Sequence, residues 1–135
     1  MPVSKKLKRM NLIVKSDDKA SIQQCKLTSD IDKLLALLRH ESAAVRVAAL
    51  REICPCHMVE DIDEFWTAVL SMTRDADLAV RKQVMHTLCD GSPPRLEAEV
   101  MAAMETLSHD ADTDLRRMAN KVKGHFQKTG KWNIL

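Results

Sequence analysis

The sequence predicts an all-α fold, an α-α superhelix or solenoid of three helix–turn–helix repeats. A turn-like segment recurs at a spacing of 35 residues, at positions 40–46, 75–81 and 110–116, and self-similarity at a fixed period is typical of repeat proteins. An apolar run with helical spacing precedes each copy, and another follows it. The 135 residues contain no Tyr, two Phe and three Gly, a composition that leaves little material for strands and favours helix.

Charge divides the chain into three regions. Residues 1–29 carry seven Lys or Arg and two Asp, and residues 121–135 carry four Lys and no acid, whereas the residues between them are acidic overall. We therefore expect a basic N-terminal extension over 1–29, a repeat domain over 30–128 and a short C-terminal tail over 129–135. The repeats are expected at about 30–54, 58–89 and 93–128.

The N-terminal extension is predicted to end in a short capping helix. We expect disorder up to about Arg9, since untethered termini fray. Ser16 is a suitable N-cap with acids after it, and it is predicted to open a helix through Ile22 and Cys25. This helix is expected to cover the open end of the first repeat, because terminal repeats would otherwise expose an apolar face.

In the first repeat, Ser29 is predicted to cap a helix with one apolar stripe, and Pro55 is predicted to end the partner helix. The apolar positions of the two helices are Ile31, Leu34, Leu35, Leu37 and Leu38, then Val45, Ala48, Ala49 and Ile53. The second repeat follows the same plan with Ile62, Phe65, Trp66, Val69, Leu70 and Met72, then Val80, Val84 and Leu88.

The segment 90–94 is predicted to separate the second repeat from the third. Gly91 is expected to terminate a helix, Ser92 to cap the next one and Pro93 to take its first position. The third repeat has Val100, Met101, Met104 and Leu107, then Leu115, Met118, Ala119 and Val122, and is expected to end near Gln127. We interpret its methionines, together with Met72, as core filler. The tail is expected to dock through Trp132 and two aliphatic residues, either on the last repeat or on a partner.

Residues 30–127 resemble the HEAT repeat family. The resemblance lies in a turn Asp, a second Asp two residues later, then Val-Arg or Leu-Arg and small apolar residues. It implies that Asp75, Arg81, Asp110 and Arg116 are framework groups that tie neighbouring turns together. The first repeat departs from the pattern, because His40 and Ser42 replace the two acids.

The resemblance also implies that the second helix of each pair lines a concave face. In register, Val47, Lys82 and Arg117 form one column across the repeats, and Arg51, His86 and Lys121 form another. We interpret these columns as a basic groove that binds an acidic segment of a protein partner, with Trp132 as a further contact. The alternative is the solvated polar face of any amphipathic helix. Nucleic-acid binding, supported by the basic cluster 5–9, is a weaker alternative, since both Trp lie off these helices.

The sequence predicts a non-catalytic scaffold without a cofactor. Cys54, Cys56 and His57 are the most metal-like group, but their spacing and the lack of a second pair do not fit zinc. His40-Glu41 is similar to the His-Glu pairs of deoxyhypusine hydroxylase, a HEAT-like enzyme that needs several such pairs. An enzyme or accessory of the lyase or hydroxylase type is therefore an alternative. With no secretory segment and no apolar run of about 18 residues, the chain is expected to be cytoplasmic, with reduced cysteines and no membrane contact.

Overall fold

The structure, a computed structural model, describes residues 18–27, 30–53 and 61–134. These residues form seven α-helices and two 3-10 helices, without strands among them, as the sequence predicts. The expected disorder before Arg9, the predicted cap at Ser16 and the predicted helix end at Pro55 lie outside the described residues. The helices are α2 (Asp18–Leu27), α3 (Ile31–Leu37), α4 (Ala43–Glu52), α5 (Asp63–Ser71), η1 (Met72–Arg74), α6 (Leu78–Gly91), η2 (Pro94–Leu96), α7 (Glu97–Leu107) and α8 (Thr113–Thr129).

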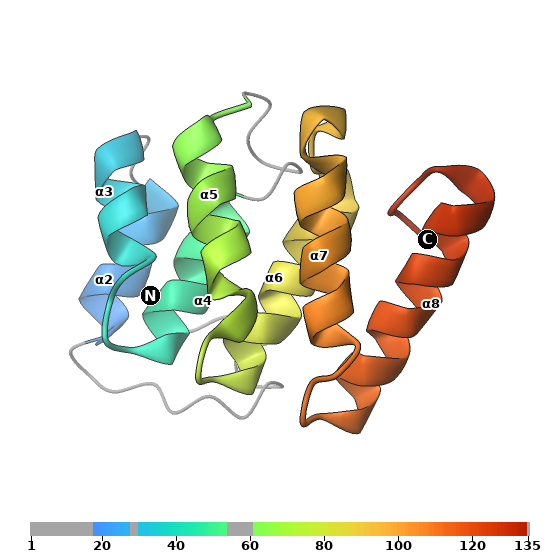
Figure 1. Ribbon diagram of the computed structural model, residues 1–135. Helices are drawn as coiled ribbons and strands as arrows, with labels where there is room; N and C mark the ends of the chain where they lie inside the picture. Colours follow the sequence, from blue (N-terminus) through green and yellow to red (C-terminus); the bar gives the residue numbers. More distant parts are fainter. Residues whose placement is uncertain (1–17, 28–29, 54–60, 135) are drawn as a thin grey trace.

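The helices stand side by side in two layers (Figure 1). In one layer α3, α5 and α7 follow one another, and behind them lie α2, α4 and α6. Each helix of the first layer packs on its successor in the chain, so α3–α4, α5–α6 and α7–α8 form three hairpins. The short helix α2 packs mainly against α4, and its Ile22 and Cys25 are buried in the common core. It thus covers one end of the stack, as expected.

The starts of α3, α6 and α8 are fixed by aspartate caps. The carboxylates of Asp30, Asp77 and Asp112 each accept a hydrogen bond from a backbone N–H in the first turn of the helix that follows. The first of these corrects the prediction of Ser29, because the cap is the next residue. One carboxylate oxygen of Asp30 accepts from the amides of both Asp32 and Lys33, at 3.0 and 3.3 Å.

The connection between α6 and α7 also differs from its prediction. Gly91 is the last residue of α6, as expected, but Ser92 extends away from that helix and does not cap the next one. A 3-10 turn over Pro94–Leu96 intervenes, and α7 begins at Glu97. Two consecutive prolines explain the difference, because each lacks a backbone donor and restricts the residue before it to extended conformations.

The predicted apolar positions form one continuous core with few exceptions. Val45, Val80 and Leu115, at equivalent positions of the three hairpins, are all buried. Met72 and Met104 are buried and Met101 is half-buried, but the prediction that Met118 belongs to the core is wrong, since it is 43% exposed.

A ladder of hydrogen bonds joins the three turns. Arg46 binds Asp75 through two parallel bonds of 3.0 Å each, and Arg81 binds Asp110 in the same way at 2.7 and 3.1 Å. Paired N–H donors match a carboxylate and hold it in one orientation. Asp75, Arg81 and Asp110 therefore tie neighbouring turns together, as the resemblance implies.

Each arginine of the ladder also holds its own turn. The third nitrogen of Arg46, Arg81 and Arg116 donates to two backbone carbonyls, five and six residues earlier in the chain. Arg116 differs from the other two, because its Nη2 donates to the Thr113 hydroxyl at 3.1 Å and the guanidinium pairs with no carboxylate of the described residues. The ladder thus ends at α8.

His40 replaces the aspartate in the first turn without changing the geometry. Its Nδ1 accepts the Ser42 amide at 3.0 Å, as the Asp75 carboxylate accepts the amide of Asp77 at 2.9 Å. The Ser42 hydroxyl donates to the buried carboxylate of Asp18 on α2, at 2.7 Å. The departure from the repeat pattern therefore serves the contact with α2.

Candidate protein-binding groove

A cavity of about 320 Å³ lies between α6 and α8. Its floor is apolar and its edge is polar. The floor comprises Met85, Cys89, Leu115, Met118, Val122 and Ile134, and the edge comprises Lys82, His86, Asp90, Asp114 and Asn133. We call this cavity and its edge the α6–α8 groove.

The repeat register shows that this groove is an opened contact between neighbouring helices. Thirty-five residues before Lys82 and Met85 stand Val47 and Leu50 of α4, and the same shift from Met118 and Val122 leads to Gln83 and Thr87 of α6. All four of these equivalents are buried, and α4 and α6 are in extensive contact, whereas α6 and α8 meet at few points. The same set of positions therefore makes a closed contact between α4 and α6 and leaves a cavity between α6 and α8.

The side chains at the groove explain why it stays open. Lys82 takes the place of Val47, and its ammonium must reach water, so the two helices cannot close over it as they do over a valine. Asp114 likewise takes the place of Ala79 on the opposite wall. Figure 1 shows α8 inclined away from α6 and α7 along its upper part.

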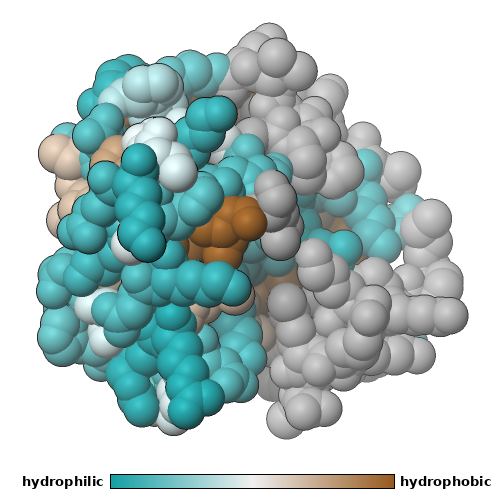
Figure 2. All heavy atoms as spheres, turned by 90° about the vertical axis from the view of Figure 1, so that its right-hand side faces the viewer, coloured by the Kyte–Doolittle hydropathy of each residue, from teal (hydrophilic) through white to brown (hydrophobic). Residues whose placement is uncertain are grey.

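Met118 is the feature of the groove that sequence reasoning missed. Its equivalents Ala48 and Gln83 are only 5% and 2% exposed, but Met118 remains 43% exposed. Viewed from the α8 side, apolar atoms are visible near the middle of a mainly hydrophilic face (Figure 2). The sequence does contain a sign that Met118 is exposed, because α6 has a glutamine at the equivalent position. The flexible thioether of a methionine also suits a surface that adapts to a partner.

The residues of the predicted basic columns lie on α4, α6 and α8, and two of them line the groove. Lys82 and His86 line it together, while Arg117 and Lys121 are exposed on α8 and are not among the residues that line the cavity. Val47 is fully buried, and Arg51 is half-buried on α4. On α4, which packs against α2, α3 and α6, the first column is thus represented by a buried apolar residue, and the binding of a partner along these columns stays a prediction.

The groove has a mixed edge beside a basic helix. Asp90 and Asp114 line the same cavity as Lys82 and His86, so the edge itself carries both signs of charge. Over its whole length, however, α8 has five Lys or Arg and one Asp. One of the five, Lys123, pairs with Glu105 of α7.

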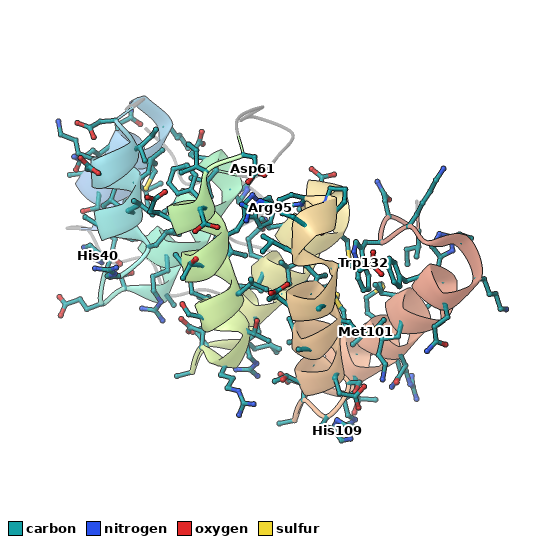
Figure 3. All side chains as sticks on the ribbon, turned by 45° about the horizontal axis from the view of Figure 1, so that its top comes forward. His40, Asp61, Arg95, Met101, His109 and Trp132 are labelled. Atoms are coloured by element: carbon teal, nitrogen blue, oxygen red, sulfur yellow. The ribbon has the colours of Figure 1, made fainter. Side chains whose placement is uncertain are left out.

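The C-terminal tail folds back onto this groove. Trp132 stacks on Phe126 of α8, with ring centroids 3.8 Å apart and planes within 8°, and Figure 3 shows it on the side of α8 that faces α7. Asn133 and Ile134 then line the cavity. Of the two dockings expected for the tail, the structure has the one against the last hairpin, and Trp132 as a partner contact stays a prediction.

The thiol in the groove is unreactive. Burial, followed by the nearby Asp90 carboxylate, raises the pKa of Cys89 to about 11. Burial likewise raises the pKa of Cys25 to about 11, with a smaller effect of Glu52. Both therefore stay protonated at neutral pH, and a nucleophilic role does not fit them, since the thiolate is the reactive form.

Metal chemistry finds no support in the described part of the chain. Across 18–27, 30–53 and 61–134, no three His, Cys, Asp or Glu side chains are placed to hold a metal ion. Cys54, Cys56 and His57 lie outside these residues. None of the helices described is both long and apolar enough to cross a bilayer.

A second charged cluster, which the sequence did not reveal, joins the other ends of α5 and α7. Arg95 of η2 binds Asp61 through two bonds of 2.7 and 3.0 Å and Asp63 through a third of 2.9 Å, and Figure 3 shows Arg95 beside Asp61. Its hydrogen bond to Arg95 holds the pKa of Asp61 below its usual value. Each group here has its partner, so we interpret the cluster as a link between hairpins.

Comparison with protein-family models, with curated proteins and with solved structures found no match to this chain.

Proposed function

We propose that the chain is a short HEAT-like solenoid of three repeats that acts as a non-catalytic protein-binding or scaffolding module. The arginine–aspartate ladder supports the repeat assignment, since it joins turns 35 residues apart with the same atoms each time. The free thiols of Cys25 and Cys89 suit a reducing compartment such as the cytoplasm. Repeat proteins of this kind bind partners on extended surfaces, without reaction chemistry.

The observation that carries the proposal is the α6–α8 groove, whose apolar floor includes the exposed Met118. Its volume of about 320 Å³ lies at the lower end of the range of ligand pockets, roughly 300–1,000 Å³. That is room for a few side chains and too little for a folded domain. We therefore propose that the groove takes apolar side chains from one segment of a protein partner.

Charge complementarity specifies that segment as acidic. Lys82 and His86 line the edge of the groove, Arg117 and Lys121 are exposed on α8, and α8 as a whole is strongly basic. Acidic residues beside the apolar anchors would be attracted to these side chains and would fix the direction of the segment. Asp90 and Asp114 at the edge argue against a phosphate backbone, which carries a charge at every nucleotide.

The test uses a fluorescent peptide of about fifteen residues, with Leu at helical spacing and Glu elsewhere, titrated by fluorescence anisotropy. Two comparison peptides replace every Glu by Lys or every Leu by Ser. We expect the acidic, Leu-containing peptide alone to bind, more weakly as salt is raised. Binding of the Lys peptide with the same affinity, or of none of the three at millimolar concentration, would contradict the proposal.

Two variants with equal change in charge locate the site. Lys82→Glu with Arg117→Glu reverses one charge at the edge of the groove and one exposed charge on α8, and Lys19→Glu with Arg74→Glu reverses two exposed charges elsewhere. The first variant is expected to weaken binding about five- to thirtyfold, since each of its two reversed surface charges contributes about 0.5 to 1 kcal/mol to the binding free energy. The control variant should bind within about twofold of the unmodified chain, and equal losses in both would place the site elsewhere.

A further inference from the structure

The C-terminal tail places an apolar side chain in the α6–α8 groove. Ile134 is a half-buried aliphatic residue that packs against the core and lines the cavity, at the place where α6 and α8 fail to meet. In the equivalent contact between α4 and α6, side chains of the two helices fill this space themselves. The tail thus supplies apolar surface that the helix contact lacks.

The path of the tail is built into the end of α8. Gly130 has φ 71°, a left-handed conformation that glycine adopts without strain, and its N–H donates to the Phe126 carbonyl at 2.7 Å. The Thr129 hydroxyl accepts the amide of Lys131 at 3.1 Å, and so fixes the next residue of the turn. The chain therefore reverses directly at the end of the helix, and this reversal places Trp132 over Phe126.

The contacts that hold the tail are non-covalent and therefore reversible. They include the stack of Trp132 on Phe126 and the packing of Ile134 against the core, while the side chains of Lys131 and Asn133 are exposed to solvent. Beyond Gly130 no described residue of the tail is in a helix. Local opening of such a segment needs no change in the packed helices, because the low-stability parts of a fold open separately from its core.

We propose that residues 131–134 form an intramolecular strap, in which Ile134 occupies the apolar end of the α6–α8 groove and competes with the acidic partner segment. This inference rests on the proposed function for the identity of the competitor, but the docking of the tail can be tested without it. The strap would lower the affinity for a partner until the partner displaces Ile134 from the groove. A tethered segment acts at an effective concentration of about millimolar, so even weak docking is enough.

The first experiment adds the tail in trans. The probe is an acetylated peptide with the sequence of residues 131–135, and the protein is the full chain with Trp132→Ser and Ile134→Ser, checked for helix content by circular dichroism. At about millimolar peptide, we expect amide chemical-shift changes at α6 and α8 in the double variant and much smaller ones in the unmodified chain, whose own tail blocks the site. Ile134→Ser alone, which keeps the Trp132 stack, provides the same measurement should the double variant lose its fold. Equal shifts in both proteins, or none in either variant, would overturn the strap.

The second experiment measures competition. The acidic Leu peptide is expected to bind the tail variant about three- to tenfold more tightly than the unmodified chain, and Gln127→Ala, at an exposed and uncharged position of α8 outside the tail, is the control with unchanged affinity. Equal affinity for variant and unmodified chain would overturn the competition and leave the proposed function standing. If the acidic peptide binds neither protein but the tail peptide binds the variant, the proposed function fails and the groove is a docking site for the tail of this chain.

Discussion

Replacing Arg81 by alanine is expected to lower the free energy of unfolding by about 2 to 4 kcal/mol. The side chains of Arg81 and Asp110 are only 16% and 8% exposed, so water screens their two hydrogen bonds weakly. The substitution also leaves two turn carbonyls without their donor. Breaking a fully buried pair costs about 3 to 5 kcal/mol and breaking an exposed one less than about 1 kcal/mol; the ladder pair lies between these limits.

The structure provides a matched control in Arg116. It makes the same two bonds to turn carbonyls, but no carboxylate among the described residues pairs with it. Arg116→Ala should therefore cost only about 1 kcal/mol. At roughly 3 to 4 °C per kcal/mol for a chain of this length, the melting temperature should fall about 6 to 16 °C for Arg81→Ala and about 3 to 4 °C for Arg116→Ala.

Urea titration and thermal melting followed at 222 nm measure both losses. The double variant Arg81→Ala with Asp110→Ala completes a cycle, for which we expect a coupling energy of about 1 to 3 kcal/mol. A coupling below about 0.5 kcal/mol, or an Arg116→Ala loss as large as that of Arg81→Ala, would refute the assignment of the carboxylate pair as the stabilising element.

Two further predictions concern α8 and acid stability. Gly124 lies inside α8, and no atom outside the local helix backbone lies within 4 Å of the place that a Cβ would take. Gly124→Ala is therefore expected to raise the free energy of unfolding by about 0.5 to 1 kcal/mol in the same urea titration. A lower free energy of unfolding would mean that a methyl group does not fit at this position. Burial alone would raise the pKa of Asp110, but hydrogen bonds from Arg81 and the Asp112 amide outweigh it and lower the pKa below 3.8. The Asp110 carboxylate therefore contributes its full share of the folding stability well above its unfolded-state pKa of 3.8, and it loses this share as the pH falls through its lowered pKa in the folded chain. The difference in unfolding free energy between the unmodified chain and Asp110→Asn should thus be constant from about pH 5 to 7 and shrink in stronger acid.

Most of the fold could be predicted because its signals are local and periodic. The 35-residue spacing of the turns set the register, and helical spacing then identified Val45, Val80 and Leu115 as core residues, which are buried as predicted. Errors occurred where adjacent residues offered the same chemistry. Both Ser29 and Asp30 can cap a helix, and only the backbone geometry shows that Asp30 does so.

The groove could be predicted only in part. Lys82 and His86 were identified from their register, but whether two helices close over such positions depends on the distance between the helices, which no periodicity contains. Met118 fits the apolar stripe of α8 as well as any core residue does, and it is exposed because the contact with α6 is open. A position that is apolar in the last repeat and polar in the one before it marks such an opened contact.

The two ends of the arginine–aspartate ladder do not match one another. A second copy of the chain, stacked so that its first turn met Arg116, would offer the imidazole of His40 where the inner turns offer a carboxylate. That imidazole already accepts the Ser42 amide, and unlike a carboxylate it has no pair of oxygens to meet a guanidinium. Head-to-tail contacts between copies build a ring when their rotation closes and a filament when it does not. Because position 40 is histidine, the first turn does not offer the carboxylate of the inner turns, and the ladder would not continue from one copy to the next.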